Sequence, residues 1–97
     1  MKPEVLYIIQ LTQQKKFTPK IIHAHVEHLR RLDDDGKLVI AGPLEGEPSG
    51  GMVIVRADSE QEALSIAEED PFIAQGFESY QVRAMTLSCR ENNYLLG

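Results

Sequence analysis

The chain has 97 residues, of which 42% are apolar and 26% are charged, and these proportions are typical of one folded domain rather than of a disordered or fibrous chain. Its net charge of −5, without a cluster of lysines and arginines, excludes a protein that binds the phosphate backbone of nucleic acids. No apolar run approaches the roughly 20 residues of a membrane span, and residues 1–4 lack the order of a signal peptide.

The first half of the chain predicts a strand followed by a helix. Residues 4–11 are a short run of β-branched and aromatic residues, which indicates a strand. An amphipathic pattern then runs from Pro19 to Asp35. Thr18 is suited to cap the start of this helix, and Gly36 to end it, because glycine readily adopts positive φ.

The second half predicts a strand pair, a helix and a last strand. Residues 37–41 and 51–56 should pair antiparallel across an irregular loop or long hairpin at residues 42–50. Ser59 and Glu62 have the spacing of a capping box at the start of a second helix, which Pro71 stops. Residues 77–86 alternate as a fourth strand, and the tail at residues 87–97 stays unassigned.

This order, β-α-β-β-α-β, predicts an α+β fold of the ferredoxin-like class, with two helices on one face of a four-stranded antiparallel sheet. We expect one domain over residues 1–97. Residues 5–9, 38–40 and 52–55 are apolar at both odd and even positions, whereas an open antiparallel sheet usually shows water a polar face. We therefore expect the helix-free face to be covered by the same face of a second subunit, in a homodimer.

The only cysteine, Cys89, cannot form a disulfide within the chain, which is typical of a reducing compartment. We expect a cytoplasmic protein whose partners include neither nucleic acid nor a membrane.

Three histidines lie within six residues of the first helix, but they do not share one face. At about 100° per residue, the aliphatic side chains form a single stripe. The members of this aliphatic stripe are Ile21, Ile22, Val26, Leu29 and Leu32. His25 falls inside the stripe, His28 at its edge, and His23 on the opposite, solvated side. The ring of His25 therefore needs a hydrogen-bond partner, and a satisfied core histidine is the non-functional alternative.

A metal site is not expected here. His25 and His28 have the weaker of the two helical ligand spacings, and the chain contains no further histidine or cysteine pair. Residues 33–35 are three aspartates that lack the glutamate and spacing of a calcium loop, so they indicate a solvated turn.

Asp70 is the carboxylate that could partner His25. Pro71 disfavours the helical conformation at Asp70, so the second helix ends at a carboxylate. In a purely structural interpretation, Asp70 caps a short turn that begins at Pro71. In the functional alternative, Asp70 holds one ring nitrogen of His25 and fixes its tautomer.

Three motifs together resemble the YciI-like (YCII-related) family: "HVEHLRRLDDDGKLVIAGP" at residues 25–43, "DPF" at residues 70–72 and "GFESYQVR" at residues 76–83. Their order and spacing, rather than any single motif, carry the resemblance. It implies a ferredoxin-like fold that associates as a dimeric α+β barrel. It also implies a catalytic histidine and aspartate, which motif position assigns to His25 and Asp70. At least one branch of the family eliminates chloride from a chlorinated hydroxyquinone.

The chain departs from this family at two positions. Ile22 stands where members often have arginine, and Ala84 where they often have proline, so contact with an anionic substrate oxygen would need another cation. Arg83 and Arg56 are the alternatives.

Residues 41–51 lack the Lys-Ser/Thr ending of a phosphate-binding loop and indicate instead the mouth of a pocket. The resemblance places the corner formed by Gly42 and Pro43 near the His-Asp pair. Gly42, Pro43 and Phe72 are the candidate substrate-binding residues.

Two functional hypotheses follow. In the first, a lyase or isomerase that needs no cofactor uses His25, oriented by Asp70, as general base toward a small cyclic oxygenated substrate. In the alternative, a non-catalytic dimeric module binds a small molecule or a protein, and the His-Asp pair is a buried structural contact. The stability of a His25→Ala variant separates them, because a structural pair would leave an unpaired buried carboxylate.

Overall fold

A computed structural model describes residues 3–97. Its elements, in chain order, are β1 (Val5–Gln13), α1 (Pro19–Asp34), β2 (Leu38–Leu44), β3 (Gly50–Arg56), α2 (Glu60–Glu69), α3 (Pro71–Ala74), β4 (Glu78–Thr86) and the 3₁₀ helix η1 (Arg90–Leu95). Met1 and Lys2, which belong to the expected domain and to the terminus without a signal-peptide pattern, lie outside the described residues.

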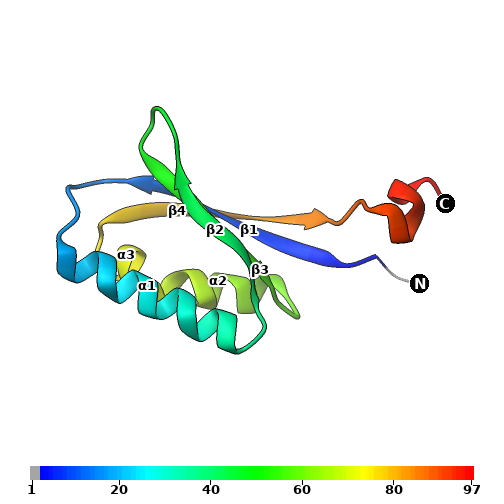
Figure 1. The fold of residues 1–97 in the computed structure, drawn as a ribbon, viewed down its shortest axis with the longest axis horizontal. Coiled ribbons are helices and arrows are strands. Elements are labelled where there is room, and N and C mark those ends of the chain that lie inside the picture. Colours follow the sequence, from blue (N-terminus) through cyan, green and yellow to red (C-terminus); the bar gives the residue numbers. More distant parts are fainter. Residues whose placement is uncertain (1–2) are drawn as a thin grey trace.

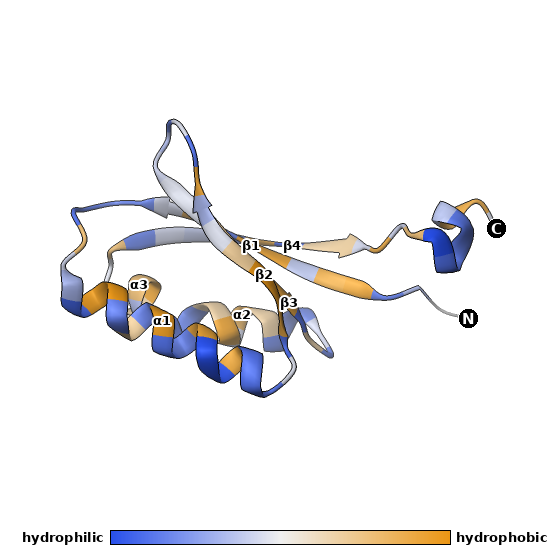
Figure 2. Cartoon of the chain, in the orientation of Figure 1, coloured by the Kyte–Doolittle hydropathy of each residue, from blue (hydrophilic) through white to orange (hydrophobic). Residues whose placement is uncertain are grey.

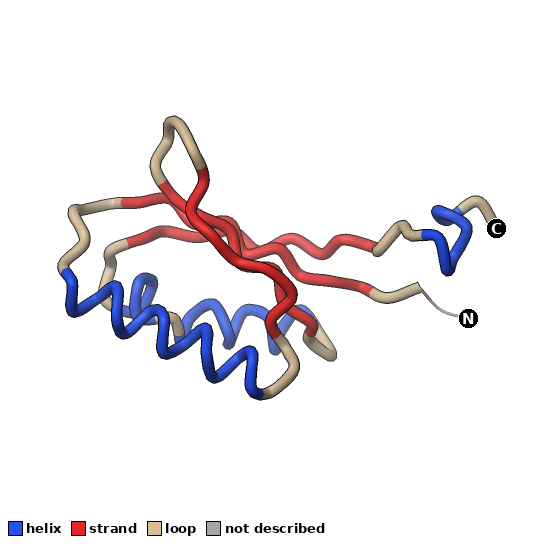
Figure 3. Tube along the Cα trace, in the orientation of Figure 1, coloured by secondary structure: helices blue, strands red, loops and turns tan. Residues whose placement is uncertain are grey.

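The four strands form one antiparallel sheet in the order β2-β3-β1-β4, and α1, α2 and α3 lie on one face of it (Figures 1 and 3). The ferredoxin-like α+β arrangement is therefore confirmed. α3 adds a single turn between α2 and β4 that the sequence indicated only as a short turn after Pro71.

Local capping sets the ends of the helices. The backbone N–H of Ile21 donates to Thr18 Oγ1 at 3.2 Å, and Pro19 is the first residue of α1, as predicted. Gly36, at φ +72°, follows the end of α1. Ser59 Oγ accepts from the backbone N–H of Glu62 at 3.1 Å at the start of α2. These contacts involve residues close in sequence, which is why the pattern alone located them.

The β2–β3 hairpin is longer than predicted. β2 continues to Leu44 and β3 begins at Gly50, so the connection is residues 45–49 rather than 42–50. Pro43 is tolerated inside β2 because β2 is an edge strand of the sheet. A Cβ at Gly50 would lie 1.9 Å from the backbone oxygen of Leu11, so only glycine lets β3 approach β1 at this point.

The core lies between the sheet and the helices, and apolar and polar residues alternate along α1 accordingly (Figure 2). Its buried members are Tyr7, Ile9, Leu11, Leu32, Val53, Val55, Ala63, Ile66 and Ala67. The helix-free face is only partly apolar. Ile8, Met52 and Ile54 are half-buried there, Ile40 is 61% exposed, and Gln10, Gln81 and Arg83 interrupt this apolar surface.

The segment after β4, unassigned from sequence, extends past the sheet beside the N-terminal end of β1 (Figure 1). The backbone N–H of Leu87 donates to Glu4 O at 2.8 Å. Tyr94, Leu95 and Leu96 are exposed. Within residues 3–97, no helix combines the length and the apolar character that crossing a bilayer would require.

Candidate functional site

A cavity of about 320 Å³ lies between α1 and the end of the sheet that carries the connection between β2 and β3. Most of its wall is apolar or glycine. The lining residues are Leu11, Phe17, Ile22, His25, Val26, Leu29, Ala41, Gly42, Pro43, Gly50, Gly51, Met52, Val53, Phe72 and Glu78. An apolar cavity with a few convergent polar groups is the usual form of a small-molecule site.

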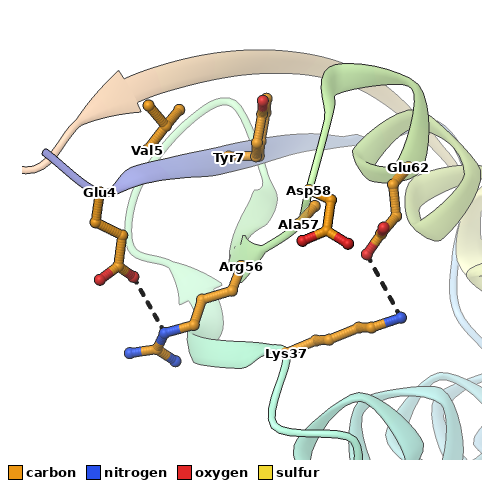
Figure 4. A pocket seen from close by; sticks show the side chains of 8 residues that line it. All are labelled: Glu4, Val5, Tyr7, Lys37, Arg56, Ala57, Asp58 and Glu62. Carbon is orange, nitrogen blue, oxygen red and sulfur yellow. Dashed lines mark hydrogen bonds and ion pairs between the residues drawn. The ribbon is translucent and has the colours of Figure 1, made fainter. Parts of the chain in front are cut away.

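A larger hollow, of about 660 Å³, lies at the opposite end of β1 and β3 (Figure 4). Its charged side chains pair with one another. Arg56 Nε lies 3.1 Å from Glu4 Oε1, and Lys37 Nζ lies 3.5 Å from Glu62 Oε1. All four side chains are substantially exposed, and such surface pairs contribute little energy. The cavity beside α1 is therefore the candidate site.

His25 and Asp70, 45 residues apart in sequence, are in contact at this cavity. His25 Nδ1 lies 2.9 Å from Asp70 Oδ1 and 3.0 Å from Oδ2. The His25 side chain is 14% exposed and that of Asp70 is 4% exposed. A carboxylate only accepts hydrogen bonds, so Nδ1 carries the proton and donates it to Asp70. Nε2 of neutral His25 is consequently the ring nitrogen with a free lone pair.

Asp70 also has the structural role that the sequence offered as an alternative. Its backbone, at φ −66° and ψ 123°, leaves the helical region before Pro71. Asp70 Oδ1 accepts from the backbone N–H of Phe72 at 2.9 Å and so caps α3. One carboxylate therefore joins α1 to the junction between α2 and α3.

Aromatic stacking fixes the plane of the His25 ring. The rings of His25 and Phe72 are stacked, with centroids 4.0 Å apart and planes 13° apart. Phe17 stacks on Phe72 in turn, at 4.3 Å and 12°. Phe72 thus lies between the two other rings, and His25 is held by a hydrogen bond at one edge and by Phe72 on one face.

The other two histidines differ in environment. His23 is exposed, as expected. His28, expected at the edge of the aliphatic stripe, is only 4% exposed, so burial extends to this edge. α1 packs against α3 as well as against β2, so more of its surface is buried than the aliphatic stripe alone. Burial lowers the pKa of His28, an effect that nearby Asp70 opposes. Among residues 3–97, no three His, Cys, Asp or Glu side chains are grouped to hold a metal ion.

All three candidate substrate-binding residues, Gly42, Pro43 and Phe72, line the cavity. Neither Arg56 nor Arg83, the two candidates to replace the arginine common in the family, lines the cavity. Arg56 belongs to the hollow at the other end of the sheet, and Arg83 lies on the helix-free face. Within the described chain, the cavity wall therefore contains no lysine or arginine.

Sequence reasoning missed Glu78, which lines the cavity from β4 and is 5% exposed. The alternation of the strand could have identified it, because Glu78 lies two residues before Tyr80 and four before Val82, and both of these side chains face the core. An acidic residue at a core-facing position of a strand indicates a buried carboxyl, which is costly unless it has a polar partner.

Comparisons with known proteins agree with the motifs at residues 25–83. Uncharacterized protein YjpA of Bacillus subtilis (strain 168) is 30% identical over 81 residues, which are 84% of this chain and 94% of YjpA. A solved structure of 5-chloro-2-hydroxyhydroquinone dehydrochlorinase (TftG) from Burkholderia phenoliruptrix AC1100, in complex with 2,5-dihydroxybenzoquinone, matches with a TM-score of 0.62 and 25% identity, over 80% of this chain and 90% of TftG. The family model for the YCII-related domain matches residues 5–86. Because that model matches most of its length, the chain belongs to the YCII-related domain family.

Proposed function

We propose that this protein is a lyase-type enzyme that removes a proton and a leaving group from a small cyclic oxygenated substrate. The observation that carries the proposal is the His25–Asp70 contact at the wall of an apolar cavity. It leaves Nε2 of His25 as a positioned acceptor for a proton. The structural similarity to TftG, whose name describes removal of chloride from a hydroxyhydroquinone, supports the same reaction class.

In this proposal His25 Nε2 takes a proton from a hydroxyl or an acidic carbon of the ring. On a chlorinated hydroxyhydroquinone the imidazolium returns this proton to the chlorine-bearing ring carbon, which gives the keto tautomer. His25 then takes a proton from a second hydroxyl, whose electrons form the new carbonyl and shift the ring double bond as chloride leaves with the electron pair of its bond, so that the net loss is HCl. Asp70 stabilises the imidazolium that forms and keeps Nδ1 protonated throughout. Isomerisation needs only the first step followed by return of the proton at another atom. Neither reaction requires a cofactor.

The test is chloride release from 5-chloro-2-hydroxyhydroquinone, followed with a chloride electrode. His25→Ala should lower the rate by about 10² to 10⁴, with an unchanged circular dichroism spectrum. His23→Ala is the matched control, because it removes an exposed histidine two residues away on the same helix. If His25→Ala releases chloride as fast as the unchanged protein, the catalytic assignment is wrong.

The alternative is a non-catalytic binding module, and one observation favours it. Asp70 caps α3 as well as contacting His25, so the pair would have a structural use without any chemistry. Binding of 2,5-dihydroxybenzoquinone by calorimetry, without turnover of the chlorinated substrate, is the result that this alternative predicts.

A homodimer formed through the helix-free face is part of the proposal. It is supported by the half-buried side chains of Ile8, Met52 and Ile54 and by the exposed side chain of Ile40. We also propose that the protein is cytoplasmic, because a single cysteine is typical of a reducing compartment.

A further inference from the structure

Glu78 presents a buried carboxyl that the proposed action of His25 and Asp70 does not use. The residue is 5% exposed, and its Oε1 is buried without a hydrogen-bond partner in residues 3–97. Buried polar atoms nearly always have a partner, because leaving one unpaired costs free energy. Because Glu78 lines the cavity, a bound ligand is the available partner for its carboxyl.

The fold brings Glu78 to the same cavity as His25 from a different element. Glu78 is the first residue of β4, paired opposite Gln13 of β1. The backbone N–H of Phe77 donates to Phe72 O at 2.8 Å, which ties the start of β4 to α3. His25 comes from α1, so the two polar side chains reach the cavity from the helix layer and from the sheet.

His25 and Glu78 are the only polar side chains among the described residues that line this cavity; all the others are apolar or glycine. A ligand with hydrogen-bonding oxygens can therefore be oriented only by these two groups and by the backbone. Among the described residues no lysine or arginine lines the wall, so apart from His25 an electron-rich oxygen of the ligand would have to be met by a neutral donor.

A protonated carboxyl is such a donor. Burial raises the pKa of Glu78 to about 7; nearby His25 opposes this rise and Asp70 adds to it. Near neutral pH a substantial fraction of Glu78 therefore carries a proton, and this form can donate one O–H hydrogen bond.

We propose that Glu78 is the second ligand-contacting residue of this cavity, and that its protonated carboxyl donates a hydrogen bond to a carbonyl or ionised hydroxyl oxygen of a cyclic ligand. The inference rests on the proposed function for the site and the ligand class. It adds a specificity: rings with an oxygen positioned for Glu78 should be preferred over rings without one.

The experiment is calorimetric binding of 2,5-dihydroxybenzoquinone from pH 5.5 to 8.5 by the unchanged protein and by variants at Glu78. Glu78→Gln keeps a donor at every pH, whereas Glu78→Met removes it. Glu69→Gln, at the exposed end of α2, is the control for the loss of one negative charge. The probe and the rest of the site are the same in every variant, so the ratio of each affinity to that of Glu78→Gln isolates the contribution of Glu78.

The unchanged protein should lose affinity relative to Glu78→Gln by about tenfold as the pH rises through 7, and Glu78→Met should bind about tenfold more weakly at pH 6. A ratio that is independent of pH, full binding by Glu78→Met, or absence of binding by the unchanged protein would each overturn the proposal. The effect of His25→Ala on chloride release is measured separately. If His25→Ala slows chloride release but the affinity ratio does not change with pH, the role of Glu78 is rejected and the proposed function stands. The ¹³C NMR signal of the Glu78 carboxyl, assigned with Glu78→Gln, provides a readout without ligand: titration near 4.5 also overturns the donor role.

Discussion

Asp70 holds Nδ1 of His25 between its two carboxylate oxygens, at 2.9 Å and 3.0 Å, while Oδ1 also accepts the backbone N–H of Phe72. The contact links the middle of α1 to the start of α3. Because the same carboxylate serves a helix cap and a ring nitrogen, substitutions at Asp70 can separate structural from chemical contributions.

We expect Asp70→Ala to lower the free energy of unfolding by about 1 to 3 kcal/mol, because it leaves the N–H of Phe72 and Nδ1 of His25 without a buried acceptor. Asp70→Asn keeps an acceptor oxygen and should lose less stability, yet it should slow turnover by at least about 10² because it cannot stabilise the imidazolium. Urea unfolding and chloride release measure the two effects. Normal turnover by Asp70→Asn would assign Asp70 to structure alone.

Glu78 should make the protein less stable as the pH rises. Because its pKa is raised from 4.5 to about 7, the folded protein retains a proton that the unfolded chain releases between these values. The stabilising contribution is complete below pH 4.5 and is lost as the pH rises through about 7, by up to about 3 kcal/mol. Glu78→Gln should remove this slope in urea unfolding between pH 5 and 8. An unchanged slope would show that Glu78 ionises as readily when folded as when unfolded.

His28 should make the protein less stable as the pH falls. Burial lowers its pKa, so the unfolded chain binds a proton near 6.5 that the folded protein does not. Its contribution to stability is present above pH 6.5 and is lost as the pH falls below that value toward the lowered pKa of the folded state. His28→Gln should flatten the acid side of the stability profile. His23→Gln, which changes an exposed ring, should leave the profile unaltered.

Two glycines at the cavity offer a matched comparison. A Cβ at Gly50 would lie 1.9 Å from Leu11 O, so Gly50→Ala should force β1 and β3 apart and cost about 1 to 3 kcal/mol of stability. A Cβ at Gly42 meets nothing within 4 Å, so Gly42→Ala should fold normally. Gly42 pairs with Met52, whose side chain lies on the helix-free face, so the added methyl group should point away from the cavity and leave binding of 2,5-dihydroxybenzoquinone unchanged. Equal stabilities of the two variants would contradict this comparison.

The helix-free face should hold two copies of the chain together. We expect the protein to sediment as a dimer at micromolar concentration and Ile54→Lys to shift it to a monomer, because the introduced charge would be buried in the interface. Gln61→Lys, on the exposed surface of α2, makes a similar change in charge away from this face. A monomer that loses no stability on dilution would refute the dimer.

Much of the fold was predictable because short-range contacts determine where elements begin and end. The cap at Thr18, the stop at Pro71 and the alternation of β4 all operate within a few residues. The length of the β2–β3 hairpin was not predictable in this way, since pairing of Leu44 with Gly50 depends on cross-strand register rather than on either residue alone.

The candidate site likewise combines features that follow from local sequence with features that depend on tertiary packing. The amino-acid pattern alone indicated that His25 faces the apolar side of α1 and that a carboxylate ends α2, and the family motifs indicated that these two residues act together. Packing between elements was needed to show that His28 is buried, that Arg56 and Arg83 lie away from the cavity, and that Glu78 completes its wall. The reason is physical: facing within one element follows from its period, whereas burial, desolvation and shared cavities arise only where elements distant in sequence pack together.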